Sequence, residues 1–271
     1  MPFVILSFAA ILLSYVLTTY GYFLSLNRLS GIHKISFSGS FAVVNTSSLI
    51  KYVPGKVWSY ALQMYWFSKA GFSKSLILYI NLINMLISLV TATIAGVICI
   101  VLSSCKIPLI FSIPPLLILL FFDILLIAYS STVFNRLISA VNFLFKRNIH
   151  YYRTSRKLFA YLHLVHTFSA LCFGIGAYFV CYGIGLNAGK QSMLPVMASM
   201  MISDVIGYIA FIVPGGLGVR EGVMYFMLQG VSNAVFPLVL PIATRVVSML
   251  ADLCAGTISF ILLKNLENKP E

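Results

Sequence analysis

The sequence predicts an all-α polytopic membrane protein built from two inverted repeats, each containing one helical element that a Pro-Gly pair breaks. Three observations lead to this prediction. Hydrophobic residues make up 60% of the 271 residues and charged residues only 9%, whereas about a quarter of the residues in a soluble domain are charged. Apolar runs long enough to cross a bilayer recur along the whole chain. Two further apolar regions are interrupted by the same triplet, Val-Pro-Gly, at residues 53–55 and 213–215.

The uninterrupted apolar runs predict membrane spans, because each reaches the roughly 20 residues that a transmembrane helix requires. They cover residues 3–26, 75–103, 107–130, 158–186 and 233–263. The first run is expected to be a retained span. It is too long for the core of a signal peptide, no basic region precedes it, and no small-residue cleavage site follows it.

The interrupted apolar regions are residues 36–68 and 192–230. Proline removes a backbone donor and glycine disfavours helix propagation, so each region should form a helix, a break and a short second helix, either re-entrant or spanning. Aligning the two triplets also aligns Met64-Tyr65 with Met224-Tyr225. Non-helical backbone at membrane depth is tolerated only inside protein or beside a watery cavity. Paired breaks in two halves therefore indicate a transporter-type binding site.

Three segments follow from this pattern. Residues 1–130 are expected to form the first membrane repeat with the broken element 36–68, and residues 158–271 the second repeat with the broken element 192–230. Residues 131–157 are predicted to form a basic amphipathic cytoplasmic connector on the membrane surface, although an ordinary basic loop fits the pattern equally well. The basic residues of this connector are Arg136, Lys146, Arg147, Arg153, Arg156 and Lys157.

The distribution of lysine and arginine predicts the orientation. If each broken region returns to the side it entered from, most basic residues outside the spans gather on one face, and only Lys106 and Lys190 lie on the other. The positive-inside rule then places the basic face in the cytoplasm, with the N-terminus outside and the C-terminus cytoplasmic. We expect the chain to lie in the cytoplasmic (inner) membrane. In this arrangement the two halves have opposite topology, as inverted repeats do. The net charge of +12 thus indicates contact with lipid headgroups rather than with nucleic acid.

Ionisable residues gather around both breaks, although charge inside a bilayer is costly and usually faces a protein interior or a cavity. Arg220 and Glu221 are adjacent and cannot face each other on a helix. We therefore expect Glu221 to pair with Arg245, and Arg220 to pair with Asp204 or Asp252. The glycines around the second break leave backbone N–H groups at a helix start, which favours an anion such as a phosphate headgroup. The predicted substrate-binding residues are Lys51, Pro54, Gly55, Lys56, Asp204, Pro214, Gly215, Gly216, Gly218, Arg220, Glu221, Arg245 and Asp252.

For any one of these residues, a purely structural role in tying helices together is the competing interpretation.

Other signals are weaker. His163 and His166 share a helix face, as metal ligands can, but no cysteine or acid accompanies them, so we expect no metal site. The chain lacks GxSxG, HExxH and nucleotide-binding motifs, so we expect no catalytic residues, no cofactor and no enzymatic activity. Four amide side chains in the apolar regions either line a polar path or bond between helices; they are Asn45, Gln63, Asn81 and Asn84.

The segments Lys51-Tyr-Val-Pro-Gly-Lys-Val-Trp58 and Pro214-Gly-Gly-Leu-Gly-Val-Arg-Glu-Gly222 resemble the lysylphosphatidylglycerol synthetase transmembrane-domain family. This family is the flippase-like membrane portion of the multiple peptide resistance factors, and it also occurs as stand-alone proteins. The resemblance covers essentially the whole chain in layout. It implies a polytopic helical fold with re-entrant elements and a role in moving or handling lipids. The positions it marks are Pro54, Gly55, Lys56, Pro214, Gly215, Gly216, Gly218, Arg220 and Glu221.

The large synthetases also carry a soluble aminoacyl-transfer domain. The 271 residues leave no room for one, so we do not expect this chain to make lysylphosphatidylglycerol. We expect a flippase-like transporter that moves a phosphate-bearing lipid, which by the resemblance is a phospholipid or a polyprenyl-phosphate-linked sugar. Its partners would then be membrane lipids with an anionic or lipid-linked phosphate headgroup. The alternative is a non-transporting accessory subunit that presents a lipid-linked sugar to a glycosyltransferase and docks through residues 131–157.

Overall fold

The computed structural model describes residues 2–31, 34–53, 57–103, 132, 135–136, 139, 152, 154–186, 192–210, 213–229, 231 and 236–267. Within these residues all regular structure is helical and no strand occurs, which confirms the all-α class. Four described helices are long and apolar enough to cross a membrane. They are α1 (Pro2–Leu29), α4 (Lys74–Leu102), α7 (Arg156–Gly183) and α10 (Phe236–Glu267). The remaining predicted span, residues 107–130, lies outside the described residues.

Serine residues set the start of several helices. The hydroxyl of Ser73 accepts a hydrogen bond from the backbone N–H of Leu76 at the start of α4, and Ser155 does the same for Leu158 at the start of α7. Such N-caps satisfy a backbone donor that has no partner within the helix. Because Ser155 caps α7, the last two residues of the predicted connector 131–157 belong to the first turn of this helix. Most of the connector lies outside the described residues.

Both predicted breaks separate two short helices. Helix α2 (Phe37–Ser48) tightens into the 3₁₀ turn η1 (Leu49–Tyr52) and is followed by α3 (Val57–Lys69). Helix α8 (Met193–Ile209) is followed by the 3₁₀ turn η3 (Pro214–Gly216) and by α9 (Val219–Leu228). In each element the second helix packs against the first. These two elements are called the first and the second broken element below. Their re-entrant character and the inverted relation of the two halves stay predictions.

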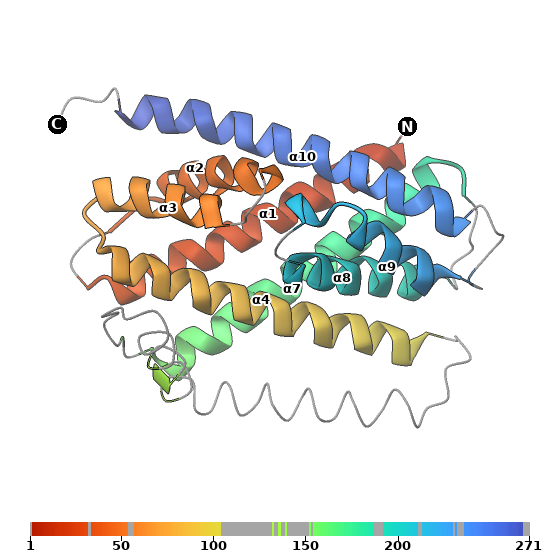
Figure 1. Cartoon of the computed structure of the whole chain (residues 1–271), viewed down its shortest axis with the longest axis horizontal. Coiled ribbons are helices and arrows are strands. Elements are labelled where there is room, and N and C mark those ends of the chain that lie inside the picture. Colours follow the sequence, from red (N-terminus) through yellow and green to blue (C-terminus); the bar gives the residue numbers. More distant parts are fainter. Residues whose placement is uncertain are drawn as a thin grey trace.

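The packing brings the two broken elements together in the middle of the molecule. Helices α1 and α7 pack along each other, with the Ser169 hydroxyl of α7 donating a hydrogen bond to the carbonyl of Ser14 in α1 at 3.0 Å. Helix α4 packs against α7 and α8. Helix α10 runs across both broken elements, over α2 at one end and over α9 at the other (Figure 1). The turns η1 and η3 contact each other, and η1 also contacts α10.

Candidate functional site

The two breaks meet directly. Gly215 in η3 has a φ of 56°, a left-handed conformation that glycine adopts without strain. A Cβ atom on Gly215 would lie 3.1 Å from the ring of Tyr52 in η1 and 2.9 Å from Nη2 of Arg245 in α10. The backbone of the second break therefore passes closely between a tyrosine of the first break and an arginine of α10. A side chain at this position would push these groups apart.

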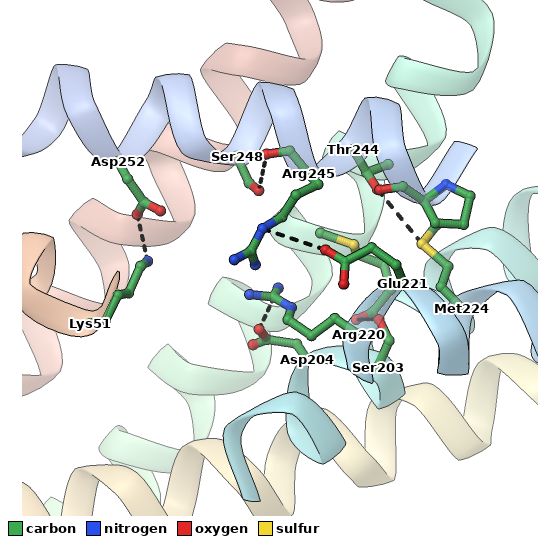
Figure 2. A network of polar contacts seen from close by, with 12 residues as sticks. Lys51, Ser203, Asp204, Arg220, Glu221, Met224, Thr244, Arg245, Ser248 and Asp252 are labelled. Carbon is green, nitrogen blue, oxygen red and sulfur yellow. Dashed lines mark hydrogen bonds and ion pairs between the residues drawn. The ribbon is translucent and has the colours of Figure 1, made fainter. Parts of the chain in front are cut away.

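Two ion pairs hold the second broken element: one lies within it and the other connects it to α10 (Figure 2). Arg220 Nη2 in α9 lies 2.5 Å from Asp204 Oδ1 in α8. Arg245 Nε in α10 lies 3.5 Å from Glu221 Oε1 in α9. The predicted pairing of Glu221 with Arg245 is thus confirmed, and of the two partners predicted for Arg220 the structure selects Asp204. Each pair joins two different helices, as expected for neighbouring residues that point in different directions.

A third pair anchors the first broken element to α10, and the sequence did not predict it. Lys51 Nζ in η1 lies 2.7 Å from Asp252 Oδ1, and the Tyr52 hydroxyl donates a 2.5 Å hydrogen bond to Asp252 Oδ2. The Lys51 ammonium also lies 5.8 Å from the ring centroid of Tyr15 in α1, within range of a cation–π interaction. Asp252 is only 4% exposed, and these two donors compensate its buried charge.

Arg245 retains unused hydrogen-bonding capacity. Its Nε and Nη2 atoms are buried and have no hydrogen-bond partner among the described residues, since Glu221 is close enough to attract the charge but does not form a hydrogen bond. Arg245, Arg220 and Glu221 line a small pocket of ≈ 10 Å³. A water molecule requires a cavity of roughly 10–15 Å³. Buried donors without an acceptor are costly, so this guanidinium favours any oxygen that can reach it.

The start of α9 is occupied by a carboxylate of the same element. The backbone N–H of Gly218 donates a 2.7 Å hydrogen bond to Glu221 Oε2, while the other oxygen of Glu221 faces Arg245. A helix N-terminus attracts negative charge through its free N–H groups and its dipole. Here Glu221 already supplies part of that charge. The Gly218 amide is therefore already occupied, whereas Arg245 still has N–H donors without an acceptor among the described residues.

The stem of Arg220 passes between two glycines. A Cβ atom on Gly207 would collide with Arg220 Cγ, and a Cβ atom on Gly216 would lie 3.1 Å from the same atom. The Arg220 guanidinium lies 5.8 Å from the ring centroid of Phe173 in α7. The two glycines therefore permit a close approach of α8, η3 and α9, and this approach directs the Arg220 head group towards Asp204.

A cavity of ≈ 310 Å³ lies between α1, α4, α7, α10 and the two broken elements. This volume is at the lower end of the roughly 300–1,000 Å³ typical of ligand sites. Among the described residues, the charged side chains that line it are Lys51, Asp204, Arg220 and Asp252. Lys51 comes from the first broken element and Arg220 from the second. In the described part of its lining, the cavity therefore contains one cation from each broken element.

The structure brings together most of the predicted site residues. Gly215 lines the cavity with the four charged residues, and Arg245 and Glu221 lie around the adjacent small pocket. Pro214, Gly216 and Gly218 form the loop that positions Arg220 and Glu221. The predicted residues Pro54, Gly55 and Lys56 lie outside the described residues.

Sequence reasoning missed the tyrosines of the site. Tyr15 and Tyr52 surround Lys51, and the hydroxyls of Tyr60 in α3 and Tyr208 in α8 are hydrogen-bonded to each other, joining the two broken elements. Tyrosines in a membrane protein usually indicate interfacial anchors, so their abundance carries no positional signal. The spacing of two tyrosines from the prolines of the breaks was a signal that could have found them: Tyr60 lies six residues after Pro54, and Tyr208 lies six residues before Pro214.

For the amide residues, the sequence left two roles open: lining a polar path or bonding between helices. Asn45 and Gln63 line the cavity. Asn45 also bonds between helices, since its Nδ2 donates a 3.0 Å hydrogen bond to Thr19 of α1. Asn84 does not line the cavity and bonds between helices, accepting from His166 Nε2 at 3.0 Å and donating to the Ser25 hydroxyl at 3.1 Å. In the part of the chain that the structure describes, no group of three or more His, Cys, Asp or Glu residues could hold a metal ion.

Comparison with known proteins supports a membrane protein of one family. The family described as "Lysylphosphatidylglycerol synthase TM region" matches residues 1–256 of the 271. Comparisons with curated proteins and with solved structures found no match. The matched region contains both broken elements, the four described membrane-spanning candidates up to residue 256, and all the ion pairs above. The chain is therefore an integral membrane protein that belongs to the lysylphosphatidylglycerol synthase TM region family.

Proposed function

We propose that this protein is a flippase-like transporter that moves a phosphate-bearing lipid across the cytoplasmic membrane. The headgroup binds in the ≈ 310 Å³ cavity while the tails remain in the bilayer. The observation that carries the proposal is that Lys51 and Arg220 reach one cavity from two different broken elements. A phosphate between them links both elements at once. No covalent chemistry is required of the protein, and the proposed orientation has the N-terminus outside and the C-terminus in the cytoplasm.

Charge balance determines how a phosphate can bind. In the described part of the site each of the three cations already holds one carboxylate, so the cluster is neutral. An anionic headgroup must therefore displace a carboxylate. The Asp204 side chain is 43% exposed, whereas that of Asp252 is 4% exposed. Exposed ion pairs contribute roughly 0–1 kcal/mol, while breaking a buried pair costs about 3–5 kcal/mol. We propose that the phosphate replaces Asp204 on Arg220.

Exchange of this partner couples binding to movement. While Arg220 holds Asp204, α9 is tied to α8 within the second broken element. When Arg220 holds a phosphate that also contacts Lys51, the second broken element is tied to the first. The hydrogen bond between Tyr60 and Tyr208 links the same two elements. A rocking motion that separates these tyrosines would open the cavity towards the other side of the membrane, as in transporters with two repeats.

The test is a transport assay with the purified full chain in liposomes. The probe is phosphatidylglycerol with a fluorophore on one acyl chain, and its exposure on each leaflet is followed by chemical quenching. Wild type should speed the transfer between leaflets. Arg220→Gln should slow it at least tenfold, because a hydrogen bond to a charged group contributes about 1.5–3 kcal/mol. Lys264→Gln, which removes one exposed charge from the far end of α10, should transport like wild type.

Two results would contradict the proposal: no acceleration by wild type, or equal rates for Arg220→Gln and Lys264→Gln in folded protein. The accessory-subunit alternative predicts a different outcome in cells. Neutralising the basic residues of the connector 131–157 would then abolish function, while Arg220→Gln would retain it.

A further inference from the structure

The cavity has a charged end and an uncharged end, and their order can be followed along α1. Tyr15 lies beside Lys51, at 5.8 Å from its ring centroid to Nζ. Thr19, one turn further along α1, accepts a 3.0 Å hydrogen bond from Asn45 Nδ2 in α2. Four residues of α-helix cover about 6 Å. A group bound next to Thr19 is therefore about one helical turn away from the charges at the first break.

The uncharged end is rich in hydrogen-bonding groups. Among the described residues that line the cavity, the charged ones belong to the three-pair cluster at the breaks, and the other polar ones are hydroxyls, amides and an imidazole. These polar lining residues include Thr18, Thr19, Asn45, Gln63, His166 and Ser169. This end therefore offers donors and acceptors without net charge.

Among the described residues of this end, Gln63 has a buried oxygen without a hydrogen-bond donor. It is only 5% exposed, and its Oε1 atom is buried with no hydrogen-bond donor among the described residues. Phe67, one turn beyond Gln63 in α3, packs in a cluster with Leu26 of α1 and Ala42 of α2. Gln63 is the middle residue of α3 (Val57–Lys69), about 9 Å along the helix from its start at the first break. A buried carbonyl oxygen without a donor is costly, and the cavity is where a donor can arrive.

We propose that the transported lipid carries an uncharged, hydroxyl-bearing group beyond its phosphate, such as glycerol or a sugar, and that Gln63 accepts a hydrogen bond from one of these hydroxyls. This inference rests on the proposed function and names its substrate class. A bare phosphate would leave Gln63 Oε1 unpaired. An ammonium group would require a carboxylate, since a buried unpaired charge is strongly unfavourable. Among the described residues, the carboxylates that line the cavity are Asp204 and Asp252, and both belong to the charged end.

The test compares lipids that differ only beyond the phosphate. The purified full chain in nanodiscs is titrated by competition with dioleoyl phosphatidylglycerol, dioleoyl phosphatidylethanolamine and dioleoyl phosphatidic acid. Wild type should bind phosphatidylglycerol about tenfold more tightly than the other two, as sites built to hydrogen-bond a hydroxyl discriminate against ligands without one. Gln63→Met, which keeps the length of the side chain but removes the amide, should lose this preference and retain its affinity for phosphatidic acid.

Asn81→Leu is the matched control. Asn81 in α4 is also 5% exposed and its Oδ1 atom also lacks a partner among the described residues, but it does not line the cavity. This variant should keep the preference for phosphatidylglycerol. Gln63→Asn moves the amide oxygen back by one methylene group and should weaken the preference for phosphatidylglycerol. It takes the place of Gln63→Met in the test if Gln63→Met does not fold. A further pair, undecaprenyl phosphate with and without one hexose, separates the two sources of hydroxyls: a larger gain from the hexose than from the glycerol assigns a sugar lipid.

Equal binding of the three dioleoyl lipids, tightest binding of phosphatidylethanolamine, or an unchanged preference in both Gln63 variants would overturn this inference and leave the proposed function intact. Failure of wild type to bind any of these phosphate lipids would overturn both.

Discussion

Asp204 is the carboxylate whose role distinguishes a binding site from a structural ion-pair network. Its side chain is the most exposed of the three paired carboxylates, at 43% against 22% for Glu221 and 4% for Asp252. In a structural network, Asp204 stabilises the fold by holding Arg220. In a binding site, it competes with the ligand for the same guanidinium. The two roles predict opposite effects of its removal on lipid affinity.

We predict that Asp204→Asn binds phosphatidic acid more tightly than wild type. The amide cannot neutralise Arg220, so the phosphate no longer has to displace a charged competitor, and a gain of about 1 kcal/mol corresponds to roughly fivefold in affinity. The measurement is the dissociation constant in nanodiscs, with Arg220→Gln as the opposite case, in which affinity should fall. Weaker binding by a folded Asp204→Asn protein would show that Asp204 positions Arg220 for the ligand rather than competing with it.

Side-chain pairing could be predicted only where the sequence restricts the choice. The chain has six acidic residues, and the adjacency of Arg220 and Glu221 forces them apart on a helix. Arg245 could therefore be named as the partner of Glu221, and the partner of Arg220 could be restricted to Asp204 or Asp252. The pair of Lys51 with Asp252 could not be predicted, since the two residues are separated by 201 positions and nothing in the pattern fixes the register of η1 against α10. The tyrosines were missed for the same reason.

At the scale of elements, the Pro-Gly triplets predicted both breaks, and the structure shows where each helix ends. The ring of a proline clashes with the carbonyl of the residue four positions earlier. For Pro214 this residue is Ala210, and α8 ends at Ile209. For Pro54 it is Ile50, which lies in the 3₁₀ turn η1 after α2 ends at Ser48. The ends of the helices thus follow from local sterics, while the meeting of the two breaks depends on packing against α10.

The contact between the first break and α10 predicts a specific cross-link. A Cβ atom on Gly256 would lie 2.5 Å from Leu49 Cγ, so cysteines at both positions should be close to the roughly 3.8 Å between Cβ atoms of a disulfide. In a background without the five native cysteines, Leu49→Cys/Gly256→Cys should cross-link on mild oxidation. A protease site inserted at residues 187–191 makes the cross-link visible as two fragments that stay joined on a non-reducing gel.

The matched control for this experiment is Leu49→Cys/Thr257→Cys. Thr257 is exposed and follows Gly256 by one residue, so its side chain points about 100° away around the helix. It should cross-link far more slowly. Equal rates for the two double variants would contradict the packing of η1 on α10.

At the scale of the whole molecule, the sequence predicted the class and the family from composition, apolar runs and the two break motifs. The four described membrane-spanning candidates and the family match over residues 1–256 confirm both. Apolar runs are informative because the bilayer fixes the length that a span requires. The cavity could not be predicted from the sequence. Its lining comes from helices that are distant in sequence, and no local sequence pattern determines how these helices are rotated relative to one another.

The predicted topology has a direct test. Single cysteines replacing Ala70, which is exposed after α3, and Ala188 should react with a membrane-impermeant thiol reagent from opposite sides of the membrane, Ala70→Cys from the cytoplasm and Ala188→Cys from outside. Both variants start from alanine in the same cysteine-free background, so they differ only in position. Labelling of both cysteines from the same side would contradict the inverted arrangement of the two halves.

The central claim, a phosphate headgroup held by Arg220 in the cavity between the two broken elements, is tested most directly by identifying the lipid that remains bound. Wild type, Arg220→Ala and the control Lys264→Ala are purified in gentle detergent and analysed by native mass spectrometry. Wild type and Lys264→Ala should retain a distinct phosphate-bearing lipid that Arg220→Ala has lost. Bulk lipid alone, in the same amount in all three proteins, would contradict the claim and leave the ion pairs as contacts that only tie the helices together.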